Sequence, residues 1–409
     1  MKSVSECRSY VINRTRTRRG IMLSFRKSIL MGFFVTLFAA LSACAPKTQL
    51  TPQVIIANEP TDLDDGILIL GNNLLAKLPS KKAVVLLEPF KEASLYDEIA
   101  SSSEIEKLLL EVGAQKAFSG IRLVSTVNAS EEDLEKADYV FRGVISYEAY
   151  PDKPSKKYYK IISTLADRTT GVQKAHEEVW VYSVSYGRQE LPVITADPNS
   201  KRKVAEIINE QRITVEDIKL DAQTAKAKNA YRNRRYDEAL GILLKLVKSP
   251  RGGRLDTYRM LYLTHLKLAD YDTAETDFLN MITVGFENNH KMPLIFLFES
   301  DEIEFEPDRF SEYGIWVRQL VAYMMLNENK CMHIIGHTSR QGDFDYNMTL
   351  SVHRAAYIQN RLAQESASIR GKITVEGRGE TATVDGSEPD SDQNMIDRRV
   401  EFELFDCNK

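Results

Sequence analysis

The stretch GHTSRQGDFDYNMTLSVHRAAYIQNRL, residues 336–362, carries the strongest fold signal in the chain. An apolar strand leads into it, and a polar loop separates that strand from a helical pattern. Leu350, Arg354 and Ile358 recur every four residues, so Arg354 lies on the apolar face of the predicted helix. A guanidinium fixed there beside the Asn347 amide suits a carboxylate, which a guanidinium binds through two parallel hydrogen bonds. We therefore predict a carboxylate-binding site at this helix.

The surrounding motifs follow a known order and spacing. They are Gly336-His337-Thr338 in the turn, Asn347, Leu350, Ser351, Arg354 and Ala355 on the helix, then Gly377, Gly379, Glu380 and the run Asp397 to Phe402. In this order they resemble the C-terminal domain of the OmpA family, over roughly residues 293–405. The resemblance implies a β-α-β-α-β-β domain at 286–409 that binds peptidoglycan through the diaminopimelate of its stem peptide.

The resemblance also implies individual roles. The implied peptidoglycan-binding set is Thr338, Ser339, Asp343, Asn347, Arg354 and Arg398. Within it, Arg354 and Asn347 correspond to residues that hold a carboxylate of diaminopimelate. The family has an Asp that binds the ammonium where this chain has Ser339. Hydrogen bonds to charged groups contribute about 1.5–3 kcal/mol against roughly 1 for neutral ones, so we expect weaker binding, or a replacement carboxylate from Asp343 or Asp345.

Other interpretations of these residues stay open. An arginine on an amphipathic helix is commonly a surface residue, and Arg354 has that alternative. His333, His337 and His353 fall close enough in sequence to suggest zinc, but His337 belongs to the turn motif and His333 alternates with it on the strand. We therefore interpret all three histidines as structural and predict no metal or other cofactor.

The N-terminal region predicts the compartment. Residues 29–43, ILMGFFVTLFAALSA, form an apolar run after Arg26 and Lys27, shorter than the roughly 20 residues that a membrane span needs. Leu41-Ser42-Ala43-Cys44 resembles a lipoprotein signal box. We expect a signal peptide at 1–43, a mature chain that begins at lipidated Cys44, and anchoring by acyl chains such as palmitate. A transmembrane anchor is the alternative.

Two details refine this expectation. Ala45, rather than Asp, follows the cysteine, which in enteric-type bacteria indicates the outer membrane. The basic stretch before the apolar run is long for a signal peptide, and Met22 begins a signal of ordinary length, so residues 1–21 are interpreted as a start-site artefact. Arg18-Arg19 leaves a twin-arginine signal as the alternative.

Two cysteines then remain in the mature chain, Cys331 and Cys407. In an oxidising periplasm such a pair is a disulfide candidate. Cys331 opens one predicted strand and Cys407 follows another, and antiparallel pairing of those strands would bring the two cysteines together. Two free thiols are the alternative.

Size and charge restrict the class of protein. The 409 residues exceed the size at which a single core stops growing, so several domains are expected. A net charge of −4, from 54 basic and 58 acidic residues, argues against nucleic acid as a partner.

The middle of the chain predicts an α+β domain at 81–212, after a proline-containing tether at 44–80 that holds one short helix. The expected elements are strands at 83–87, 121–125, 139–147, 157–166 and 173–183 and helices at 103–118, 131–136 and 204–210. Asp167 to Gly171 forms a hairpin turn. This order, with ADRTTG in the hairpin, is similar to the periplasmic domain of CsgG and LpoB lipoproteins. The acid pairs Asp97-Glu98 and Glu131-Glu132 lie at helix starts, which carboxylates favour without catalysis.

Residues 218–285 are predicted to be helical and to repeat. Tyr236-Asp237-Glu238-Ala239 recurs as Tyr271-Asp272-Thr273-Ala274, close to the 34-residue tetratricopeptide period. Two units are fewer than usually stand alone, so we expect the pair to pack on a neighbouring domain. It serves either to capture a peptide or as a structural spacer.

The sequence thus predicts a multidomain α+β lipoprotein that is not an enzyme. The leading hypothesis is a protein that binds peptidoglycan and tethers the outer membrane to the wall. The competing hypothesis is an envelope assembly, synthase or secretion regulator that binds a periplasmic protein through residues 81–285. Catalysis ranks third, because no nucleophile, base and metal occur together.

Overall fold

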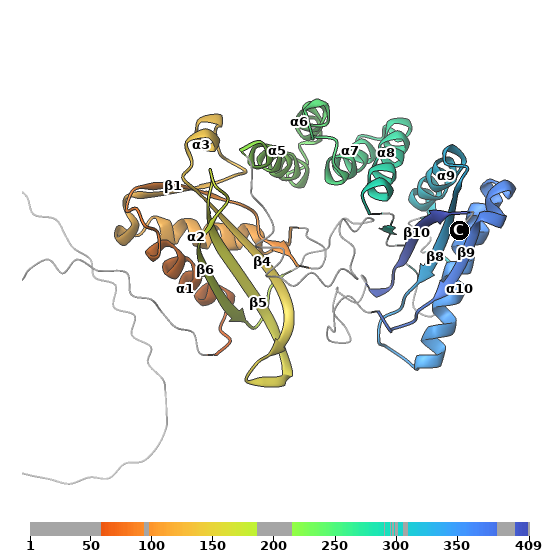
Figure 1. Cartoon of the computed structure of the whole chain (residues 1–409), viewed down its shortest axis with the longest axis horizontal. Helices are drawn as coiled ribbons and strands as arrows, with labels where there is room; N and C mark the ends of the chain where they lie inside the picture. Colours follow the sequence, from red (N-terminus) through yellow and green to blue (C-terminus); the bar gives the residue numbers. More distant parts are fainter. Residues whose placement is uncertain are drawn as a thin grey trace, which may run out of the picture. The chain divides into compact units, whose positions relative to one another are not determined.

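The computed structural model describes residues 59–93, 98–185, 215–289, 291–294, 296, 298, 302–305, 310–382 and 397–407. Within these ranges the chain is a mixed α/β multidomain protein (Figure 1). The expected signal peptide, Cys44, Asp97 and the helix at 204–210 lie outside them. None of the described helices combines the length and the apolar character needed to cross a membrane.

The N-terminal domain is built on a mixed sheet. Its strands are β1 (Ala83–Leu87), β2 (Lys91–Glu92), β3 (Ile121–Ser125), β4 (Tyr139–Tyr150), β5 (Lys153–Asp167) and β6 (Gln173–Val181). The order is β3-β1-β4-β5-β6, with β2 paired to β4. β1 runs parallel to β3 and β4, whereas β4, β5 and β6 form an antiparallel meander. Gly171 has the positive φ that the β5–β6 turn requires, as the sequence predicts.

Helices α1 (Leu63–Ala76) and α2 (Ser102–Gly113) cover one face of this sheet (Figure 1). The 3₁₀ turn η1 (Lys116–Phe118) and helix α3 (Glu131–Lys136) complete the domain, and Ser130 with Asp133 forms a capping box on α3. One boundary in the sequence prediction is wrong. Residues 63–76 are no part of a tether, because α1 buries Ile67, Leu70 and Leu74 completely in the core.

Four helices follow as two antiparallel pairs, α5 (Val215–Arg232), α6 (Tyr236–Lys248), α7 (Leu255–Lys267) and α8 (Tyr271–Asn289). Helices α6 and α8 begin at the two copies of the repeated motif, Tyr236 and Tyr271. Ala239 and Ala274, the small residues of that motif, are both fully buried. They allow close helix packing within each pair.

The C-terminal domain has the β-α-β-α-β-β order expected from its motifs. Its elements are β7 (Lys291–Leu294), α9 (Phe310–Leu326), β8 (Lys330–Gly336), α10 (Phe344–Glu365), η3 (Ala367–Lys372), β9 (Ile373–Gly377) and β10 (Val400–Asp406). The sheet order is β7-β10-β8-β9. β8 and β9 are parallel, and β10 is antiparallel to both β7 and β8.

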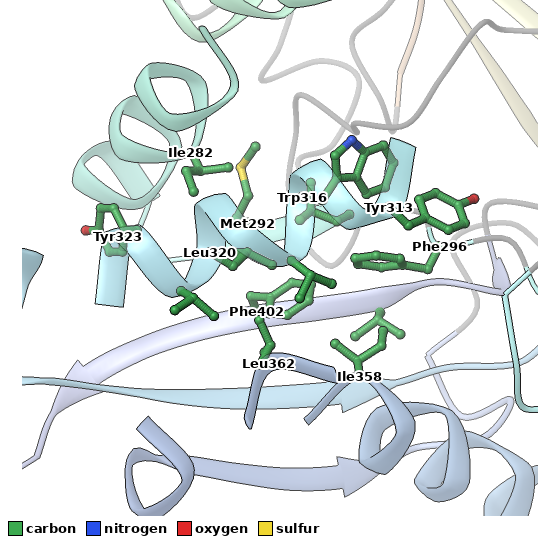
Figure 2. Close-up of a cluster of buried hydrophobic side chains, with 14 of the residues drawn as sticks. Ile282, Met292, Phe296, Tyr313, Trp316, Leu320, Tyr323, Ile358, Leu362 and Phe402 are labelled. Carbon is green, nitrogen blue, oxygen red and sulfur yellow. The ribbon is translucent and has the colours of Figure 1, made fainter. Parts of the chain in front are cut away.

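The second repeat and the C-terminal domain share one hydrophobic core. Phe278 of α8 stacks on Trp316 of α9 with ring centroids 5.7 Å apart, and the Trp316 indole donates a 2.7 Å hydrogen bond to the Tyr262 hydroxyl of α7. Figure 2 shows Trp316 and Leu320 on the same side of the sheet as Phe402 of β10. The helical pair therefore packs on its neighbour, as two repeats alone would require.

Cys331 and Cys407 are joined by a disulfide, with their Cα atoms 5.0 Å apart. The pairing register explains it, because β8 and β10 are antiparallel and Cys331 lies opposite Phe405. The backbone amide of Cys407 also donates a 3.0 Å hydrogen bond to the carbonyl of Asn329. The two ends of these strands are thus fixed both covalently and by the backbone.

Candidate binding site at the start of helix α10

Close packing of α10 on the ends of β8 and β9 creates the site. A Cβ atom at Gly336 would overlap the Ser351 carbonyl, and one at Gly377 would overlap the Ser351 hydroxyl. Ser351 in turn accepts a 2.9 Å hydrogen bond from the Gly379 amide. The motif glycines and serine therefore hold the helix against the strand ends, which positions Asn347 over the loops that follow β8 and β9.

Asn347 connects the two loops. Its buried side-chain amide donates hydrogen bonds to the Gln341 carbonyl at 2.9 Å and to Glu380 Oε2 at 2.8 Å, and it lies 3.4 Å from the Ser339 carbonyl. The Thr338 amide adds a 2.9 Å bond to the Gly379 carbonyl. The Glu380 carboxylate is thereby held beside the turn that contains Ser339.

Arg354 lies seven residues after Asn347, on the same face of α10. It is only 3% exposed. Its Nε donates a 3.1 Å hydrogen bond to the Glu302 carbonyl, and the guanidinium carbon lies 4.8 Å from the centre of the Phe298 ring. The surface-arginine alternative is therefore wrong: Arg354 is buried between the helix and the segment that contains Phe298 and Glu302.

The remaining predicted residues occupy different positions. Thr338 and Ser339 are buried in the turn, and the Thr338 hydroxyl has no hydrogen-bond partner among the described residues. Asp343 caps α10, accepting hydrogen bonds from the Asp345 and Tyr346 amides at 2.9 and 3.2 Å. Capping engages Oδ1 of the Asp343 carboxylate.

Arg398 follows β9 in sequence and immediately precedes the buried Arg399. Its side chain is half-buried. Arg399 belongs to a buried group of charged side chains around β10.

A buried charged cluster of His337, Arg399 and Glu401 lies at the start of β10. Arg399 donates to Glu401 Oε1 from Nε at 2.8 Å and from Nη2 at 2.6 Å, and His337 Nε2 is 3.4 Å from the same oxygen. Burial alone would raise the pKa of Glu401, but the His337 hydrogen bond and the Arg399 charge outweigh it and lower that pKa to about 2. Burial lowers the pKa of His337. The cluster therefore favours a neutral histidine and an ionised glutamate.

The three histidines do not converge. His333 Nε2 lies 3.4 Å from Glu376 Oε2, His337 belongs to the charged cluster, and His353 is exposed on α10. No group of three His, Cys, Asp or Glu side chains in the described ranges is placed to hold a metal ion.

The geometry presents charges of both signs. Arg354 supplies a cation and Glu380 an anion, and the Asn347 amide on α10 donates a hydrogen bond to the glutamate. Such a site suits a ligand that carries both an ammonium and a carboxylate. The sequence identified Arg354 and Asn347 but gave Glu380 no role, although it stands in the Gly-x-Gly-Glu motif. Only the hydrogen bond to Asn347 reveals its position.

Comparison with known proteins agrees with the C-terminal motifs. Residues 297–396 match the model of the OmpA family. No curated protein sequence matches the chain.

Several solved structures are similar to the C-terminal part. The peptidoglycan-associated lipoprotein from Burkholderia pseudomallei is 18% identical, and the alignment covers 27% of this chain and 88% of that one, with a TM-score of 0.24. The OmpA-like domain of FopA1 from Francisella tularensis is 17% identical, with 29% and 77% covered and a TM-score of 0.23. The cell wall anchor of the T6SS from Pseudomonas aeruginosa is 21% identical, with 28% and 82% covered and a TM-score of 0.24.

Proposed function

We propose that this chain, which carries an OmpA-family domain at its C-terminus, is an outer-membrane lipoprotein that binds peptidoglycan non-covalently and tethers the membrane to the wall. The family match supports the wall-binding half of the proposal. The apolar run at 29–43 and the Leu-Ser-Ala-Cys box that ends at Cys44 support the membrane half.

The placement of Arg354, Asn347 and Glu380 carries the ligand assignment. The free end of diaminopimelate in a stem peptide has an ammonium and a carboxylate on one carbon. In the proposed complex the carboxylate replaces the Glu302 carbonyl at Arg354 Nε, exchanging a neutral acceptor for a charged one. Glu380 takes the ammonium, the role of the Asp that Ser339 replaces.

Co-sedimentation with purified sacculi tests this site. Arg354→Lys keeps the charge and removes the planar guanidinium, so loss of its hydrogen bonds to a charged group should weaken binding roughly 10- to 150-fold. Arg370→Lys, on the exposed end of η3, is the matched control and should bind like the parent. Because Arg354 is buried, the fold of each variant is checked by near-UV circular dichroism. A folded Arg354→Lys protein that sediments like the parent contradicts the site.

The regulator hypothesis is retained because a structured domain and a repeat pair precede the wall-binding domain. In that case residues 81–285 contact a synthase, secretion or assembly protein, and wall binding only positions the chain. Crosslinking of the full-length chain in cells tests it. A single envelope protein crosslinked to residues 81–285 supports the regulator, and crosslinks to peptidoglycan alone support the tether.

A further inference from the structure

The end of the β4–β5 hairpin extends beyond the rest of the sheet (Figure 1). β4 and β5 remain paired from Tyr139–Asp167 to Tyr150–Lys153, whereas β6 ends at Val181, opposite Tyr159. No strand of the described residues therefore lies beside the paired residues beyond Tyr159.

Four aromatic side chains gather at this hairpin end. Tyr150 lies edge-on to Tyr158 at 5.6 Å and to Trp180 at 5.2 Å, and Tyr158 lies edge-on to Tyr182 at 5.8 Å. Tyr182 is 52% exposed, Tyr158 and Trp180 are half-buried, and Tyr150 is buried. The four rings thus pack against one another, and the Tyr182 ring is exposed to solvent.

Lysines and acids both lie around the aromatic cluster. Lys153 and Lys156 are exposed near the hairpin tip, and Lys160 lies 5.5 Å from the centre of the Trp180 ring and forms a 3.0 Å ion pair with Glu178. Burial and the nearby charges of Asp152 and Glu59 raise the pKa of Tyr150. Lys157 packs over Tyr147 on the opposite face. We call Tyr150, Tyr158, Trp180, Tyr182, Lys153 and Lys156 the hairpin-end surface.

The N-terminal segment enters the domain beside this surface. The Thr61 amide donates a 3.0 Å hydrogen bond to the Trp180 carbonyl, and the Tyr182 amide donates a 2.9 Å bond to the Thr61 carbonyl. The chain from Cys44 to Thr61 is 17 residue steps long and spans at most about 60 Å when fully extended. A lipid on Cys44 would keep the hairpin-end surface within that distance of the bilayer.

We propose that the hairpin-end surface docks on a membrane surface that contains anionic phospholipids. This inference rests on the proposed lipid anchor at Cys44. Tyrosine and tryptophan favour the membrane–water interface because they combine an apolar ring with a polar group, and lysines are attracted to anionic headgroups. Hairpin stability alone would require neither the exposed Tyr182 ring nor the exposed lysines. The anchor makes docking intramolecular, so weak contacts suffice.

Vesicle co-sedimentation tests the surface without the lipid. The protein is the chain from residue 44 with Cys44→Ala, and the vesicles are phosphatidylcholine alone or phosphatidylcholine mixed with phosphatidylglycerol. The parent should bind only the mixed vesicles. The triple variant Tyr182→Ser, Lys153→Gln, Lys156→Gln should bind at least about tenfold more weakly, because each lysine near an anionic surface contributes about a factor of five.

The β5–β6 turn and the end of α3 supply the residues of a matched control. The variant Val172→Ser, Lys136→Gln, Lys174→Gln removes one exposed apolar side chain and two exposed lysines, with the same change in net charge. It should bind like the parent. A parent that fails to bind mixed vesicles, or two variants that bind equally, overturns the proposal.

The chain has two tryptophans, which gives a second measurement. Trp316 is fully buried in the C-terminal core, whereas Trp180 belongs to the hairpin-end surface. Vesicles with brominated acyl chains should quench Trp180, and a Trp180→Phe protein should show no quenching. Quenching that persists in Trp180→Phe would show that another surface contacts the lipid.

Sacculus co-sedimentation separates this inference from the wall-binding proposal. The hairpin triple variant should bind sacculi like the parent. If its wall binding falls with its vesicle binding, the hairpin contacts the wall and the membrane proposal is wrong. If the parent binds vesicles and not sacculi, the wall-binding proposal fails while membrane docking stands. Membrane fractionation of lipid-free Cys44→Ala protein tests the anchor by itself.

Discussion

Glu401 shows how a single buried residue couples the C-terminal domain to pH. Its folded-state pKa, about 2, lies below the ordinary value of 4.5. A depressed acid pKa contributes stability that is fully present above the ordinary value and is lost as pH falls through the folded one, here between about 4.5 and 2. The lowered pKa of His337 acts in the same direction, because a buried neutral imidazole resists protonation below its ordinary 6.5.

We therefore expect Glu401→Gln to lower the free energy of unfolding by about 3 kcal/mol at pH 7, since it leaves the buried Arg399 without its counter-charge. The difference from the parent should shrink toward pH 2. Urea unfolding followed by Trp316 fluorescence in a Trp180→Phe background measures it. Glu403→Gln, on the same strand and half-buried, should have a much smaller effect. A pH-independent difference would contradict the assigned pKa.

Substitution of Glu380 and a compensating substitution of Ser339 should change binding to sacculi in opposite directions. If Glu380 holds the ligand ammonium, Glu380→Gln should weaken sacculus binding roughly 10-fold or more, through loss of a charged hydrogen bond. Ser339→Asp should recover binding in the Glu380→Gln background by restoring the family's carboxylate. In the parent background the added charge lies beside Glu380, and binding should stay level or fall. Full binding by Glu380→Gln would remove Glu380 from the site.

The sequence predicts part of this site and omits the rest for a physical reason. Helical spacing places Arg354 and Asn347 on one face, because that relation is local. The contacts of Arg354 with Glu302 and of Asn347 with Glu380 join residues 52 and 33 positions apart. Such contacts depend on how the loops close over the helix. The burial of Arg354 and the position of Glu380 therefore become visible only in the folded chain.

At the scale of elements, alternation and turn residues predict the strands well. β1 and β3 have the expected bounds, and β4 and β5 are longer than expected because their hairpin continues past the sheet. Helix α1 is the informative error. Prolines at 46, 52, 60 and 79 favour a tether, but Ile67, Leu70 and Leu74 form an apolar stripe at helical spacing. Because all four prolines lie outside residues 63–76, the apolar stripe is the better predictor of structure there.

The disulfide between β8 and β10 should stabilise the C-terminal domain against unfolding. It closes a loop of 76 residues, for which chain entropy predicts that removing the bond costs up to about 4.5 kcal/mol, and disulfides typically contribute about 2–4. Cys331→Ala with Cys407→Ala should therefore unfold at lower urea concentration than the parent. Mass spectrometry of unreduced peptides tests the bond directly, and free alkylation of both cysteines in the native protein would refute it.

The second helical pair and the C-terminal domain are not independent domains. Phe278, Tyr262 and Trp316 belong to one core that crosses the boundary predicted at residue 286. A fragment that begins there would expose the α9 face on which Phe278 stacks. The sequence indicated that the repeat pair needs a neighbour, but only three-dimensional packing identifies which residues serve both.

Lipidation is the prediction for the whole chain. Cys44→Ala should release the protein to the soluble periplasmic fraction, because docking without acyl chains is weak and reversible. Fractionation at high salt, which screens the contribution of the lysines, makes the result clear. Ala45→Ser, which leaves the cysteine in place, is the control and should remain in the membrane. Membrane retention of Cys44→Ala at high salt would mean that another segment anchors the chain.

The covalent closure at Cys331 and Cys407 has a mechanical consequence. Thr338, Asn347, Arg354 and Glu380 all lie between these two cysteines in sequence. In a protein pulled between a bilayer and a wall, tension would enter this loop at Cys331 and leave through the bound ligand. The disulfide joins Cys407, which follows β10, to Cys331, where the force enters. Pulling can then extend the residues before 331 without separating the end of β10 from β8. The binding site would therefore stay folded, and bound to its ligand, while the preceding domains are extended.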